Sequence, residues 1–119
     1  MITLVWRAVF GLLVATVIWY SLAPPPDIGD FSHADKAGHF LAYAALGFSG
    51  FLGWPGARYR LFVICGLIAM GAALEMLQAF RPMREPSLAD AFANSLGAVF
   101  GMGLAYYVVG LWRRLAARS

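Results

Sequence analysis

Long apolar runs separated by short polar connections form the main pattern of this chain. The runs occupy approximately residues 4–22, 37–54, 61–80 and 88–112. Each is close to the ~20 residues that a helix needs to cross ~30 Å of hydrocarbon. Proline and glycine stand between several of the runs, where they end helices. The pattern predicts an all-α fold, an integral membrane four-helix bundle that forms a single domain over residues 1–119.

Composition argues against a soluble protein. Of the 119 residues, 61% are hydrophobic and only 13% are charged, whereas roughly a quarter of the residues in a soluble domain are charged. Four spans use nearly the whole chain, so only helix ends and short connections remain to carry chemistry. We therefore expect no separate soluble domain.

The net charge of +3 is explained by membrane orientation. One side of the membrane would hold Arg7, Arg58, Arg60, Arg113, Arg114 and Arg118. Cytoplasmic connections are enriched in Lys and Arg. We therefore expect both termini in the cytoplasm and the connections around residues 23–36 and 81–90 outside the cell. This sorting accounts for the charge, and we expect no nucleic-acid partner.

Two helix starts share one sequence pattern. The pattern S-x-x-D at residues 32–35 and 87–90 predicts a capping box, in which Ser accepts a backbone N–H and the carboxylate reaches back to the Ser N–H. We expect the second helix to start near His33. Asn94 follows the second pattern as His39 follows the first. The spacing suggests two duplicated helical hairpins, related by an axis along the membrane normal.

Small residues predict where the helices pack closely. Gly97 and Gly101 form a GxxxG face, and Gly38 with Ala42 forms a similar strip in the second run. Such strips let two helix backbones approach each other. We expect the polar face of the second helix to point into the bundle.

Glu75 is a carboxylate inside an apolar run. At ~1.5 Å per residue it should lie roughly 8 Å below the outer helix end, where an unpaired charge costs about 2–3 kcal/mol. It therefore needs a partner or a proton. We expect a cationic cluster of Lys36, His39 and one of Arg81 or Arg84 to hold it.

The polar residues of the last three runs gather at the outer helix ends. His39, Glu75 and Asp90 are the candidates for proton transfer or catalysis. The residues expected to bind a substrate are Asp35, Lys36, Tyr43, Gln78, Arg81, Arg84 and Asn94. Arginine provides a planar fork that matches phosphate.

Each of these residues also has a purely structural interpretation. Asp35 and Asp90 fit helix capping, and Lys36 fits snorkelling to the interface. For Asn94, a hydrogen bond between helices is favoured over a ligand contact. Glu75 is the exception, because structure seldom needs a carboxylate in lipid.

The order and spacing of these residues resemble a known family. The matching positions are Asp35, Lys36, His39, Tyr43, Glu75, Gln78, Arg84, Asp90, Asn94 and Gly97. Over residues 35–101 this pattern is similar to that of the VanZ-like family. The resemblance implies a multi-pass protein of the bacterial inner membrane. The family is named for a member linked to low-level resistance to the glycopeptide antibiotic teicoplanin.

Three functions remain open from the sequence. The favoured one is an enzyme or binder that acts on an anionic lipid-linked headgroup of the cell envelope, such as a cell-wall precursor or polyprenyl phosphate. The alternative is a non-catalytic accessory subunit that docks onto a larger membrane complex by its glycine faces. A metal site built from Asp35, His39, Glu75 and Asp90 is disfavoured, because no HExxH-like spacing supports it. We expect no cofactor.

Overall fold

The computed structural model contains four helices and describes residues 1–23, 32–80 and 87–119, with only the backbone described for 32–35. The helices are α1 (Ile2–Leu22), α2 (Ser32–Gly53), α3 (Ala57–Gln78) and α4 (Leu88–Ala116). No strand occurs in these described ranges. The all-α prediction is confirmed, and the start of α2 falls one residue from the expected position.

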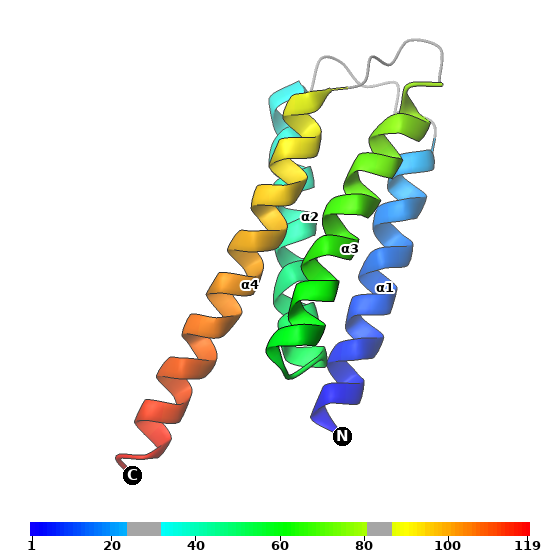
Figure 1. The fold of residues 1–119 in the computed structure, drawn as a ribbon. Coiled ribbons are helices and arrows are strands. Elements are labelled where there is room, and N and C mark those ends of the chain that lie inside the picture. Colours follow the sequence, from blue (N-terminus) through cyan, green and yellow to red (C-terminus); the bar gives the residue numbers. More distant parts are fainter. Residues whose placement is uncertain (24–31, 81–86) are drawn as a thin grey trace.

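The helices alternate in direction (Figure 1). α1 and α3 run away from the end that holds both termini, and α2 and α4 run back toward it. The two termini therefore lie at one end of the bundle, as the sorting of arginines predicts, and we call this the arginine end. α2 and α4 are parallel, as the duplicated hairpins require. The cytoplasmic placement of that end stays a prediction.

Among the described residues, three helices are long and apolar enough to cross a membrane, namely α1, α3 and α4. α2 is not among them. Its first turns carry Lys36 and His39, and many of its later residues are Gly, Ala or Ser. α2 contacts each of the other three helices. Protein therefore surrounds much of this helix, so its surface needs less hydrophobicity than that of a lipid-facing helix.

Glycine brings α2 and α4 into backbone contact. A Cβ atom at Gly47, Gly97 or Gly101 would overlap a carbonyl of the facing helix. These carbonyls belong to Ala98, Phe40 and Ala44, respectively. The GxxxG prediction for α4 is confirmed, because the buried face of this helix includes Gly97 and Gly101. We call this contact the α2–α4 seam.

The prediction that Gly38 lies in a close contact between helices is wrong. Gly38 is exposed, and a Cβ atom there would meet nothing within 4 Å. The glycine of α2 that contacts α4 is Gly47, two and a half turns further along the helix. Because Phe40, two residues further on, contacts Gly97 of α4, Gly38 lies at the level of the contact but on another side of the helix.

At the arginine end, side chains of neighbouring helices cap the C-terminal end of α2. The last carbonyls of a helix have no partner within it, and α2 has no basic residue in its last turn. Arg7 of α1 donates from Nε to the Gly53 carbonyl at 2.8 Å. Arg60 of α3 donates from Nη2 to the Phe51 carbonyl at 3.4 Å. Arg7 and Arg60 therefore cap α2, in addition to being part of the charge pattern from which the membrane orientation is predicted.

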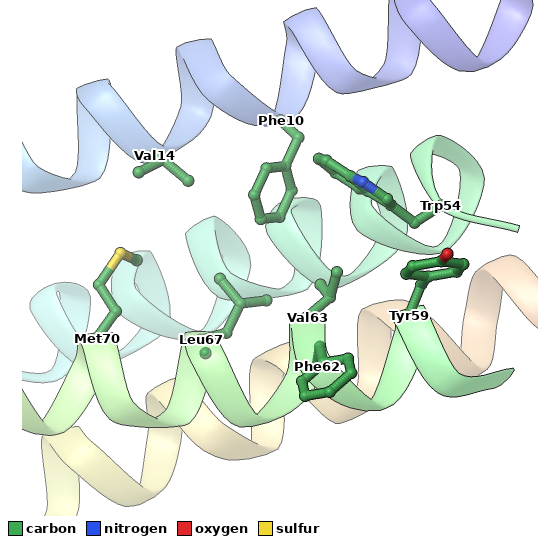
Figure 2. Close-up of a pocket in the computed structure, with 9 residues that line it drawn as sticks. Phe10, Val14, Trp54, Tyr59, Phe62, Val63, Leu67 and Met70 are labelled. Carbon is green, nitrogen blue, oxygen red and sulfur yellow. The ribbon is translucent and has the colours of Figure 1, made fainter. Parts of the chain in front are cut away.

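α1 and α3 leave space between them. An apolar groove of about 350 Å³ opens there, and Figure 2 shows its side chains. It is lined by Phe10, Val14, Trp54, Tyr59, Phe62, Val63, Gly66, Leu67 and Met70. Most of these residues come from α1 and α3. The bundle therefore contains one closely packed parallel pair and one loosely packed parallel pair.

Candidate functional site

His39 of α2 and Asn94 of α4 form one hydrogen-bonded unit across the seam. His39 Nδ1 and Asn94 Oδ1 are 3.1 Å apart. An amide oxygen can only accept, so Nδ1 is the donor and Nε2 of a neutral imidazole holds the lone pair. Asn94 is buried with 2% of its surface exposed. The two positions paired by the duplicated pattern are thus in direct contact, and the interhelical role favoured for Asn94 is confirmed.

Tyr43 lies close to this pair. It is 1% exposed, and its hydroxyl has no hydrogen-bond partner among the described residues. A Cβ atom at Gly71 of α3 would lie 3.4 Å from the Tyr43 hydroxyl and 3.4 Å from Asn94 Nδ2. The absence of a side chain at Gly71 therefore leaves room for Tyr43 and Asn94 to converge beside α3.

Glu75 and Gln78 face inward from α3. Glu75 is 7% exposed and lies one turn beyond Gly71 on the same side of the helix. Its Oε2 accepts a hydrogen bond from the Ser87 backbone N–H at 3.4 Å. Gln78 Nε2 donates to the Ser21 carbonyl near the end of α1 at 3.0 Å. Both side chains therefore connect α3 to the ends of neighbouring helices.

The start of α4 confirms half of the predicted capping box. Ser87 is the N-cap residue, and its hydroxyl accepts from the Asp90 backbone N–H at 3.3 Å. The other half is wrong, because the Ser87 N–H donates to Glu75 and not to Asp90. Aspartate is one methylene shorter than the glutamate of the usual capping box. Asp90 Oδ1 is buried and has no hydrogen-bond partner within the described ranges.

Lys36, one of the cations predicted to hold Glu75, lies apart from the described site. Lys36 is exposed and forms no ion pair or hydrogen bond with any described residue. Its place at the helix end lets the long side chain reach the membrane boundary. Its predicted pairing with Glu75 is therefore wrong. Arg81, Arg84 and the side chain of Asp35 lie outside the described residues.

The remaining predicted residues gather at the bundle end opposite the arginine end (Figure 1). We call them the polar cluster: His39, Tyr43, Glu75, Gln78, Asp90 and Asn94. The side chains that the structure describes contain no group of three or more His, Cys, Asp or Glu that could hold a metal ion.

Sequence reasoning missed two contributors to the polar cluster. Gly71 provides space beside Tyr43 and Asn94, and the backbone of Ser87 is the partner of Glu75. A signal for Gly71 existed, since it precedes Glu75 by four residues and so shares its helix face. No sequence signal could identify the Ser87 N–H, because every residue except proline has one.

Apolar helices of membrane-spanning length and a buried polar cluster at one bundle end define a helical membrane protein with a polar site. The family follows from comparison with known proteins. Residues 3–112 match the family model described as VanZ/LLP1, and the chain belongs to this family. The resemblance noted in the sequence is thereby confirmed. No curated protein and no solved structure matches the chain.

Proposed function

We propose that this protein binds the anionic headgroup of a lipid-linked cell-envelope molecule at the polar cluster. The polar cluster would lie at the outer face of the bacterial inner membrane, which the helices cross several times. A polyprenyl phosphate or a lipid-linked cell-wall precursor has the required chemistry, a phosphate attached to a membrane-embedded chain.

Two buried atoms without partners carry the proposal. The Tyr43 hydroxyl and Asp90 Oδ1 have no hydrogen-bond partner among the described residues. An unsatisfied buried polar atom costs about 1–3 kcal/mol, so such atoms are usually paired or serve a function. A headgroup would provide the missing partners, since its oxygen accepts from Tyr43 and its hydroxyl donates to Asp90.

The other polar residues would position these two groups. The hydrogen bond to Asn94 fixes the orientation of His39, whose imidazole would exchange a proton with the headgroup. Glu75 holds the start of α4, and therefore the backbone that carries Asp90. Lys36 at the rim, with Arg81 and Arg84, would attract the phosphate.

The outer location follows from charge. The termini and Arg7, Arg60 and Arg113 are at the arginine end, which the positive-inside rule assigns to the cytoplasm. The polar cluster would then face the periplasm. The association of the family with teicoplanin, a drug that acts outside the cell, agrees with this location.

The accessory-subunit alternative has less support. That hypothesis used the glycine faces for docking, but Gly97 and Gly101 already contact α2 within the same chain. A partner protein would have to use another surface. The unpartnered atoms of the polar cluster would also have no role in such a contact.

The test is binding of polyprenyl phosphate to the purified protein, measured by native mass spectrometry, with the uncharged polyprenyl alcohol as reference ligand. Tyr43→Phe removes only a hydroxyl that has no partner in the described part of the chain. We expect binding to weaken by about tenfold, while the melting temperature stays equal or rises. Tyr107→Phe, at an exposed tyrosine of α4, is the matched control and should change neither. Unchanged binding by Tyr43→Phe, or equal binding of phosphate and alcohol, would contradict the proposal.

A further inference from the structure

The groove between α1 and α3 is separate from the polar cluster. Figure 2 shows Phe10 and Val14 of α1 on one side, Leu67 and Met70 of α3 on the other, and Trp54 near the end of α2. Its volume of about 350 Å³ falls in the range of ~300–1,000 Å³ typical of ligand pockets. Its lining is almost entirely apolar, so it suits a hydrocarbon chain.

The length of the groove matches one leaflet of a membrane. Along α3 the lining extends from Tyr59 to Met70, twelve residues that span ~16 Å at a rise of ~1.5 Å per residue. The hydrocarbon core of a bilayer is ~30 Å thick, so the groove covers about half of it. Tyr59 lies in the first turn of α3. In a bilayer that α3 crosses, the groove would therefore occupy the leaflet at the arginine end and stop near the midplane.

A fixed cation stands at the mouth of this groove. The Arg7 guanidinium carbon lies 5.4 Å from the centre of the Trp54 ring, and Trp54 lines the groove. Arg7 also precedes Phe10 by one helical turn, so both lie on one face of α1. Its Nε donates to the Gly53 carbonyl, while its other N–H groups bond to no described residue and the side chain is exposed.

We propose that the groove binds one acyl chain of an anionic glycerophospholipid from this leaflet, with the lipid phosphate at Arg7. An apolar channel one leaflet deep, with a fixed guanidinium at its mouth, complements both parts of such a lipid. The arginines at this end add positive potential that favours anionic over neutral headgroups. The site does not depend on the function of the polar cluster.

Gly66 allows the groove to be filled without disturbing the helix. It lines the groove, and a Cβ atom there would meet nothing within 4 Å. Gly66→Leu should therefore fold normally and place its side chain where the lipid chain lies. Gly103→Leu is the matched control, because Gly103 of α4 is also exposed, has equally open space, and lies outside the groove.

The experiment titrates delipidated full-length protein in detergent with dioleoyl phosphatidylglycerol or dioleoyl phosphatidylcholine and counts bound lipids by native mass spectrometry. We expect one tightly bound lipid, with phosphatidylglycerol preferred. Gly66→Leu should weaken binding of both lipids by about tenfold, and Gly103→Leu should bind as the unmodified chain does. Arg7→Gln should remove the preference for phosphatidylglycerol while phosphatidylcholine still binds.

Four results would overturn the proposal. The groove is not the lipid site if Gly66→Leu binds lipid as well as Gly103→Leu does. The phosphate is not at Arg7 if the unmodified protein binds both lipids equally, or if Arg7→Gln keeps the preference. The occupant is a second copy of the chain if the unmodified protein is a dimer that Gly66→Leu dissociates.

Discussion

The bundle contains two parallel helix pairs that pack in opposite ways. α2 and α4 touch through glycine, with a backbone carbonyl against each glycine face. α1 and α3 are separated by large side chains such as Phe10 and Phe62, which border an open groove. Lipid tails are as apolar as leucine, so hydrophobicity does not drive membrane helices together. The size of the contact residues therefore decides whether a pair forms a rigid seam or a groove.

The two pairs also differ in what they can hold. The α2–α4 seam brings His39 and Asn94 to hydrogen-bonding distance, which a wider spacing would prevent. The α1–α3 pair is joined by the hydrogen bond from Gln78 to the Ser21 carbonyl, and elsewhere it borders an apolar groove of about 350 Å³. If the hairpins arose by duplication, α1 is equivalent in origin to α3, and α2 to α4, so each pair brings together two related helices.

The largest expected effect comes from breaking the seam. Gly101→Leu places a side chain where the Ala44 carbonyl lies, and backbone cannot move aside as a flexible side chain does. We expect a loss of about 3 kcal/mol or failure to fold, measured as the melting temperature in detergent. Gly103→Leu, two residues away and in open space, should melt as the unmodified protein does. Equal melting temperatures for the two variants would show that the seam is not close-packed.

A smaller effect is expected from cutting the link between the two pairs at Glu75. Glu75→Leu removes the acceptor of the Ser87 N–H and should lower stability by about 1–3 kcal/mol. Glu75→Gln keeps an acceptor oxygen and should retain most of the stability. Met76→Leu, at an exposed neighbouring position, controls for effects of substitution in α3. A Glu75→Leu protein as stable as Glu75→Gln would mean that the link contributes nothing.

The hydrogen bond between His39 and Asn94 across the seam should contribute less to the free energy of unfolding. A double-mutant cycle with His39→Ala and Asn94→Ala isolates the hydrogen bond at 3.1 Å. Interhelical hydrogen bonds in membranes average about 0.6 kcal/mol and reach about 1.7, so we expect a coupling energy in this range. The coupling would be contradicted if the double variant lost as much free energy of unfolding as the two single variants together.

The smallest effect on stability is expected at the groove, where a substitution should stabilise the protein slightly and not destabilise it. Gly66→Ala adds a methyl group in open space and replaces a residue that costs a helix about 0.5–1 kcal/mol relative to alanine. The melting temperature should stay constant or rise slightly. A clear destabilisation would show that α1 and α3 approach more closely than the groove allows.

Patterns with one strong physical cause were predicted well from the sequence. The apolar runs predicted the four helices, because spanning a bilayer requires a fixed length. Gly97 and Gly101 predicted the seam, since few other roles explain two glycines one turn apart in an apolar helix. The Ser87 cap was also predicted correctly.

Predictions failed where the outcome depended on how two helices meet. Gly38 and Gly47 are both glycines of α2, but only Gly47 faces α4. The partner of the Ser87 N–H depended on where α3 places Glu75. The groove depended on the distance between α1 and α3, for which their apolar sequences give no signal. The local sequence of a helix does not determine how that helix is placed against its neighbours.

The capping of α2 by Arg7 and Arg60 has a consequence for biogenesis. The chain enters the membrane in order, so α1 and its Arg7 are present when the end of α2 is made. Arg60, the partner of the Phe51 carbonyl, lies in α3 and follows later. We therefore expect α2 to gain its complete set of C-terminal donors only once α3 has been inserted, so that the first three helices mature together in the membrane.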